Sequence, residues 1–167
     1  MRNLRPIIAI LLICAFALIA ENREFPEFKA KDVDGGEFVL SKFVAEGPII
    51  LTFWATWCKP CLKELEKLTE MQNFLDAHGV RVLAINTDGP RTRGKAKPFA
   101  QKNNWQFTIV MDPDGSIKSL AGVAEIPEMF ILDTNRIILH HHVGYKPGDE
   151  VEYRDKIKTL FPIDGEE

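Results

Sequence analysis

Two cysteines, Cys58 and Cys61, are separated by two residues and lie where an apolar run gives way to a patterned segment. The apolar run at residues 49–54 predicts a buried strand, and the spacing of apolar residues from 60 to 78 predicts an amphipathic helix. The N-terminus of a helix carries partial positive charge and unpaired backbone N–H groups, which stabilise a thiolate. We therefore expect Cys58 to be the attacking thiolate and Cys61, one turn deeper, to be the resolving thiol.

The two residues between the cysteines favour the same chemistry. Lys59 places a cation beside Cys58, and thiols in such Cys-x-x-Cys settings have a pKa of about 3.5–7.5 instead of about 8.5. Pro60 suits the first turn of a helix, where its missing N–H has no intrahelical partner. The pattern predicts a pair that exchanges between dithiol and disulfide.

Other interpretations of the pair stay open. A structural crosslink seldom closes so short a loop, because the stabilisation that it gives grows with loop length. The same thiolate could reduce a small peroxide, or the two soft sulfurs could hold Cu(I) as a binding module. A zinc site needs two more ligands, and the run His140, His141, His142 is the evident source. On a strand His140 and His142 share one face, but such a run is more often a solvated edge, and we predict no metal site.

The first twenty residues are expected to be a targeting segment that is not part of the folded domain. Arg2 and Arg5 precede an apolar run from Ile7 to Ala20, after which the sequence turns polar. At about 1.5 Å per residue this run makes about 21 Å of helix, short of the hydrocarbon thickness of about 30 Å. A cleaved signal peptide and a short membrane tether through residues 6–20 both fit. Residues 21–167 then form one exported domain, which keeps only Cys58 and Cys61.

The composition indicates a globular domain and argues against nucleic-acid binding. The chain has 167 residues, 46% of them hydrophobic, and a formal net charge of −3. This is enough for one packed domain, and it supplies no excess of Lys and Arg to neutralise a run of phosphates. We therefore expect a globular domain that does not bind nucleic acid.

The order of predicted elements indicates an α/β fold with a mixed sheet and helices on both faces. Strands are expected at 37–40, 49–54, 80–86 and 107–111, and a hairpin at 129–132 and 137–140, on the edge of the sheet. Helices are expected at 60–78, at 95–104, from a Ser116 cap to 121, and at about 148–160. Strand, helix and strand from 49 to 86 predict a parallel pair joined by a right-handed crossover.

With the segment Phe53-Trp54-Ala55-Thr56-Trp57-Cys58-Lys59-Pro60-Cys61 in view, the chain resembles the thioredoxin-like thiol–disulfide oxidoreductases of the TlpA/ResA type. The likeness extends over most of residues 25–161 and includes Asn86-Thr87-Asp88, the Asp-x-x-Gly turn at 112–115 and Ile126-Pro127. It implies a thioredoxin-like fold with an added N-terminal strand or hairpin in residues 25–45.

The resemblance also assigns residues. Pro127 matches the family's cis-proline, which lies against the active-site sulfurs, and Ile126 fills the neighbouring place that tunes substrate contact. The substrate would meet a rim made by Trp54, Trp57, Lys59, Pro60, Ile126 and Pro127.

Glu64 stands where ResA-like members have a buried acid that handles the proton of the interior thiol, and Thr52 replaces the buried Asp of thioredoxin itself. A carboxyl that is partly desolvated near a thiolate has a raised pKa. The alternative for Glu64 is an exposed side chain paired with Lys59, Lys63 or Lys67.

The implied function is that of a protein-disulfide reductase at the extracytoplasmic face of the cytoplasmic membrane or in the periplasm. Its partners would be a disulfide-containing substrate protein and a membrane electron donor, with apocytochrome c thiols as a candidate target. No cofactor is expected.

Overall fold

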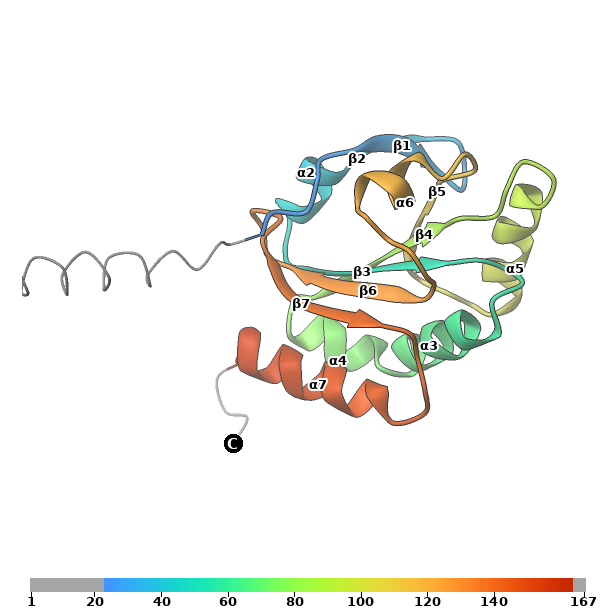
Figure 1. Cartoon of the computed structure of the whole chain (residues 1–167). Coiled ribbons are helices and arrows are strands. Elements are labelled where there is room, and N and C mark those ends of the chain that lie inside the picture. Colours follow the sequence, from blue (N-terminus) through green and yellow to red (C-terminus); the bar gives the residue numbers. More distant parts are fainter. Residues whose placement is uncertain (1–22, 164–167) are drawn as a thin grey trace, which may run out of the picture.

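A computed structural model of the chain describes residues 23–163 (Figure 1). The leader expected at residues 1–20 lies outside the described residues and stays a prediction. Within 23–163, none of the helices combines the length and the hydropathy that crossing a bilayer requires.

One seven-stranded sheet runs through the molecule in the order β2-β1-β5-β4-β3-β6-β7. The neighbouring strands β3, β4 and β5 are parallel, and the pairs β1–β2, β1–β5, β3–β6 and β6–β7 are antiparallel. The strands are β1 (Lys29–Asp32), β2 (Glu37–Val39), β3 (Ile49–Trp54), β4 (Arg81–Asn86), β5 (Thr108–Met111), β6 (Glu128–Leu132) and β7 (Ile138–Val143). The mixed sheet predicted from the sequence is confirmed, as is the hairpin β6–β7 at its edge.

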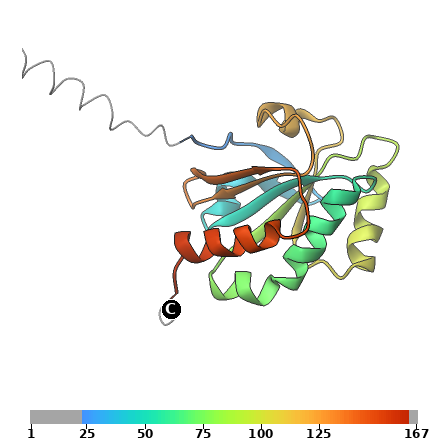
Figure 2. The same cartoon turned by 60° about the horizontal axis from the view of Figure 1, so that its bottom comes forward.

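Helices cover both faces of this sheet (Figures 1 and 2). On one face lie α3 (Lys59–Glu70), α4 (Gln72–Ala77), α5 (Ala96–Lys102) and α7 (Asp149–Leu160), and on the other lie α2 (Leu40–Val44) and α6 (Ser116–Leu120). A short 3-10 turn (Arg93–Lys95) leads into α5. The helices thus bury two separate apolar layers, one on each side of the sheet.

The central strand β3 shows why the chain folds this way. All six of its residues are buried, as the continuous apolar run predicts for a strand covered on both faces. Ile50 and Trp54 point into the layer under α3, while Ile49, Leu51 and Phe53 point into the opposite layer. The joint between β3 and α3 therefore lies at the centre of the sheet, where its position is fixed from both sides.

Two local predictions are wrong. The helix expected at 60–78 is broken at Met71 into α3 and α4. The apolar spacing continues through the break because Leu68, Met71 and Leu75 are buried in the same layer, so periodicity alone does not report it.

The expected cap of α6, Ser116, is a helical residue instead. Gly115 takes the cap position in the left-handed region at φ 72°. The acceptor for the first helical N–H groups comes from further back in the chain. The Asp112 carboxylate accepts hydrogen bonds from the backbone N–H of Ile117 at 3.0 Å and of Lys118 at 2.9 Å. The Asp112 carboxylate, four residues before the helix, therefore caps α6 in place of the expected Ser116 hydroxyl.

Candidate active site

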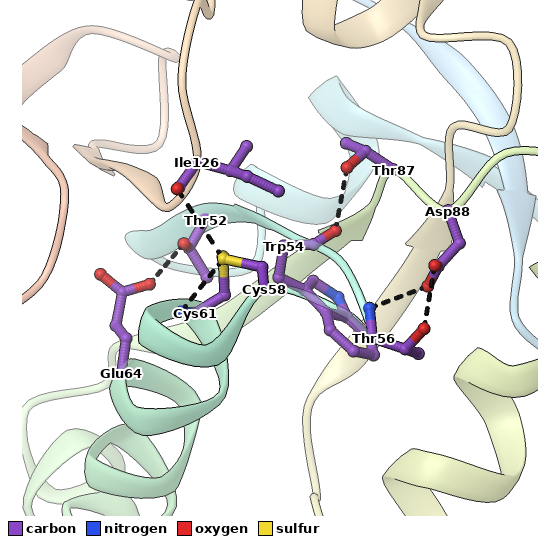
Figure 3. Close-up of a disulfide and its surroundings, with 9 residues drawn as sticks. All are labelled: Thr52, Trp54, Thr56, Cys58, Cys61, Glu64, Thr87, Asp88 and Ile126. Atoms are coloured by element: carbon purple, nitrogen blue, oxygen red, sulfur yellow. Dashed lines mark hydrogen bonds between the residues drawn. A yellow bond between two sulfur atoms is a disulfide. The ribbon is translucent and has the colours of Figure 1, made fainter. Parts of the chain in front are cut away.

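The cysteine pair lies at the start of α3, as predicted. Cys58 and Cys61 form a disulfide (Figure 3), and Cys58 is the residue that caps the helix. The backbone N–H of Cys61 donates to Sγ of Cys58 at 3.3 Å. A thiolate at Cys58 would receive this donor and the positive end of the 12-residue helix together.

The two sulfurs differ in their access to solvent. Cys58 is 5% exposed, whereas Cys61 is completely buried. Sγ of Cys58 lies 3.7 Å from the carbonyl oxygen of Ile126, on the loop that enters β6. Of the two cysteines, only Cys58 therefore keeps any exposed surface, and its sulfur lies beside the Ile126 peptide.

Glu64 is fully buried one turn beyond Cys61 (Figure 3). The Thr52 hydroxyl on β3 donates to its Oε2 at 2.6 Å, and the Tyr153 hydroxyl on α7 donates to its Oε1 at 3.0 Å. Burial raises the pKa of Glu64 to about 7, although these two hydrogen bonds act to lower it. The exposed alternative for Glu64 is thus wrong.

The lysines that could have paired with Glu64 in that alternative face solvent. Lys63 and Lys67 form ion pairs with Glu66 and Glu70 on the outer side of α3. The carboxyl of Glu64 instead has two neutral hydroxyl donors, and it can hold a proton near neutral pH.

A buried carboxylate fixes the loop before the cysteines. Oδ2 of Asp88 accepts from the backbone N–H of Thr56 at 3.0 Å, and Oδ1 accepts from the Thr56 hydroxyl at 2.9 Å. The side-chain amide of Asn86 donates to Oδ2 at 2.8 Å. The end of β4 thereby holds the loop that presents Cys58. Sequence reasoning quoted Asp88 only as part of a family motif and missed this role, since its partner lies 32 residues away.

Trp54 does not lie in the expected rim. Its side chain is completely buried and packs edge-to-face against Trp105, with ring centroids 5.0 Å apart. As the last residue of β3, Trp54 points into the layer covered by α3 and α5. Its side chain packs beneath the connection between β3 and α3. Trp57, by contrast, is 64% exposed beside Cys58.

The other expected rim residues surround Cys58. The Ile126-Pro127 peptide bond is cis, as the family resemblance implies. Ile126 is half-buried and Pro127 is buried, whereas Lys59 and Pro60 are exposed on the first turn of α3. A role of these residues in substrate binding stays a prediction.

The histidine run on β7 alternates between the two faces of the sheet. His141 stacks on Phe130, with ring centroids 4.6 Å apart, and its Nε2 lies 2.7 Å from the Glu128 carboxylate. His140 and His142 face α7 on the opposite side and are mostly buried. The prediction that these two share one face is confirmed, whereas the interpretation of the run as a solvated edge fits His141 better than its neighbours.

Comparison with known proteins decides the family. The model of the AhpC/TSA family matches residues 22–141. This chain belongs to that family. The chain is 30% identical to the thiol–disulfide oxidoreductase ResA of Bacillus thuringiensis subsp. konkukian. The alignment spans 140 residues, which are 84% of this chain and 78% of the relative. The chain is also 32% identical to the thioredoxin-like protein YneN of Bacillus subtilis, over 81% of this chain and 79% of the relative.

A solved structure agrees with these relatives. A Chlorobium tepidum protein proposed as the thiol:disulfide interchange protein DsbE matches with a TM-score of 0.74 and 31% identity, over 83% of this chain and 95% of that one. The expected thioredoxin-like fold is confirmed. Together with the Cys58–Cys61 disulfide, these likenesses identify the AhpC/TSA protein as a thiol–disulfide oxidoreductase.

Proposed function

We propose that this oxidoreductase is a protein-disulfide reductase that acts outside the cytoplasmic membrane, with Cys58 as the attacking sulfur. The observation that carries the proposal is the contrast between the two sulfurs. Cys58 caps α3, keeps 5% of its surface exposed and accepts the Cys61 N–H, whereas Cys61 is completely buried. This contrast supports attack by Cys58 followed by resolution by Cys61.

The Cys58 thiolate attacks one sulfur of the partner's disulfide, forming a mixed disulfide and releasing the partner's other sulfur as a thiolate. Cys61 then loses its proton and attacks Sγ of Cys58. This forms the Cys58–Cys61 disulfide and releases the partner's second thiolate, so that two electrons have passed to the partner.

Glu64 is the proposed acceptor of the Cys61 proton. It is one helical turn from Cys61, and a pKa of about 7 lets it exchange a proton at neutral pH. Because Cys61 and Glu64 are both completely buried, water does not offer an equally direct acceptor. The carboxyl and the interior thiol thus form the proton-handling half of the site.

The proposed binding surface surrounds Cys58. The exposed indole of Trp57 and the first turn of α3, with Lys59 and Pro60, lie on one side, and the Ile126-Pro127 peptide lies on the other. This arrangement would receive an extended segment of a disulfide-containing protein, with the Ile126 backbone alongside.

The leader and the relatives support the proposed location and partners. A positively charged start and a short apolar run at residues 1–20 favour export, with the run either cleaved or kept as a tether. Oxidised Cys58–Cys61 would then be reduced again by a membrane electron donor. The proposed target is a disulfide of apocytochrome c, which the exchange would convert to the two thiols in cytochrome c maturation.

A trapping experiment tests the order of attack. In Cys61→Ser the mixed disulfide cannot be resolved, so Cys58 should hold partner proteins covalently until a reductant releases them. The matched control is Cys58→Ser, which should trap no partner because Cys61 is buried. Equal trapping by the two variants would contradict the proposal.

A pH titration of alkylation tests the thiolate itself. In the reduced protein, iodoacetamide should label Cys58 with an apparent pKa below the reference value of about 8.5. The redox midpoint of the pair, together with turnover on a protein disulfide and on hydrogen peroxide, separates a reductant from a peroxidase. Faster turnover on peroxide, or labelling of Cys58 no faster than free cysteine, would overturn the proposal.

A further inference from the structure

A second cluster of ligating side chains lies away from the cysteines, between β7 and α7. His140 and His142 project from the same face of β7 with ring centroids 6.4 Å apart, and Glu152 faces them from α7. Oε1 of Glu152 is 3.5 Å from Nε2 of His140, and Oε2 is 4.0 Å from Nδ1 of His142. Two imidazole nitrogens and one carboxylate thus converge on a common point, with their ligating atoms all within 4.8 Å of one another.

His140 is left with an unsatisfied polar atom at this point. Its Nε2 is buried and has no hydrogen-bond partner among the described residues. A buried polar atom without a partner is costly, and it commonly marks a place that a water or an ion completes. Here the atom faces a carboxylate oxygen at a distance longer than a hydrogen bond.

His142 is held in the tautomer that a metal requires. Its Nε2 lies 3.1 Å from Oδ2 of Asp149, and a carboxylate can only accept, so Nε2 carries the proton. Asp149 is fixed in turn because it accepts the backbone N–H of Lys146 at 2.9 Å. The lone pair of His142 is therefore on Nδ1, the nitrogen that faces Glu152. Metal-binding histidines characteristically donate their other N–H to a carboxylate in this way.

We propose that His140 Nε2, His142 Nδ1 and the Glu152 carboxylate bind a divalent transition-metal ion, with Zn²⁺ as the best match to two imidazoles and a carboxylate. A tetrahedral zinc ion with ligands about 2.0–2.1 Å away holds them about 3.4 Å apart, so the three groups need to draw together by little more than about 1 Å. The Glu152 side chain is 48% exposed and is free to make this movement.

The proposed site is separate from the redox pair. The His142 ring packs edge-to-face on Tyr153, with centroids 5.4 Å apart, and the Tyr153 hydroxyl reaches Glu64 on the other side. Tyr153 thus stands between the two sites. Metal binding can be measured on the oxidised protein, in which the Cys58 and Cys61 sulfurs are bonded to each other and are not thiolate ligands.

The test uses the full chain in its oxidised form, without a polyhistidine tag and with Cys14 alkylated. Competition against a chromophoric chelator measures Zn²⁺ affinity, and Co²⁺ reports geometry through its visible absorption bands. We expect one equivalent of Zn²⁺ and the strong bands of four-coordinate Co²⁺. His140→Ala and His142→Ala should each weaken binding by more than about 100-fold. Asp149→Asn should weaken it by about 10- to 100-fold, the usual cost of losing a partner behind a metal ligand.

His141→Ala is the matched control, because it removes the same side chain from the opposite face of the same strand. It should leave the Zn²⁺ affinity within about twofold, since neither ligand nor ligand partner is lost. Equal losses in His141→Ala and His142→Ala would show unspecific binding to surface histidines and would overturn the proposal. Absence of saturable Zn²⁺ binding, or Co²⁺ bands of a six-coordinate ion only, would do the same.

Discussion

The two faces of the sheet bury different kinds of side chain. The face under α2 and α6 is filled largely by aromatic rings, with Phe130 at the centre of contacts to Phe25 and Phe53. The face under α3 and α7 buries Glu64 with its two hydroxyl partners, next to the cysteine pair. The layer under α2 and α6 contributes apolar packing. The layer under α3 and α7 also contains an ionisable side chain, whose burial costs free energy.

This difference predicts that only the face under α3 and α7 makes the free energy of unfolding depend on pH. The pKa of Glu64 is about 7 in the folded protein against 4.5 for an unperturbed glutamate. Between pH 4.5 and about pH 7, Glu64 therefore keeps its proton in the folded protein, whereas in the unfolded chain it has lost that proton. Stability from Glu64 is fully present below about pH 4.5 and is lost as the pH rises through about 7, a change of about 3 kcal/mol.

The largest expected effect comes from the aromatic face. Phe130→Ala should lower the free energy of unfolding by about 3–5 kcal/mol, because a fully buried ring leaves a cavity. Its neighbour Met129 points to the opposite face and pairs with Thr52. Met129→Ala should destabilise by about 2–5 kcal/mol and should also admit water near Glu64, which lowers the pKa of that carboxyl.

Urea unfolding of both variants from pH 4 to pH 8 distinguishes the two faces. Phe130→Ala should keep the pH slope of the wild-type protein, and Met129→Ala should flatten it. The same slope in the two variants would show that the faces are not separable in this way.

Replacing the buried carboxyl has the next largest effect. Glu64→Gln keeps the shape of the side chain and removes the titration, so the variant should gain about 3 kcal/mol over the wild-type protein between pH 4.5 and pH 8. The measurement is the difference between the two unfolding curves, taken on the oxidised proteins so that no thiol titrates at the pair. Parallel curves across this range would mean that Glu64 does not hold its proton to neutral pH.

The smallest expected effect concerns the hydroxyl that reaches Glu64 from α7. Tyr153→Phe removes the donor to Oε1 and should cost about 1 kcal/mol. It should also move the pH-dependent loss of stability upward, since that hydrogen bond lowers the pKa of Glu64. Tyr145→Phe is the matched control, because its hydroxyl donates to Glu150, whose side chain is not buried. An equal shift of the pH midpoint in both variants would assign the effect to something other than the Glu64 contact.

Much of the redox site was accessible from the sequence because its determinants are local. The strand at 49–54 and the helix start at Cys58 follow from neighbouring residues. The buried position of Glu64 was predicted only through the family resemblance. Trp54 was misplaced in the rim, although the continuous apolar run that ends with it already favours a buried position.

The partners that complete the site were not accessible in the same way. Tyr153 is 89 residues from Glu64, and Asp88 is 32 residues from Thr56. No periodicity or spacing connects such positions, because the docking of α7 and the end of β4 sets these contacts. The approach of Glu152 on α7 to His140 and His142 on β7 has the same origin.

The unequal burial of the two sulfurs also sets the kinetic order of the proposed cycle. Encounter takes place at Cys58 alone, so capture of a partner is second order and scales with the partner's concentration. Release depends on Cys61, which never meets a free partner, so it is first order and proceeds at its own rate. In a single turnover that starts from the reduced protein, the rate at saturating partner would then report how quickly the interior thiol loses its proton and attacks.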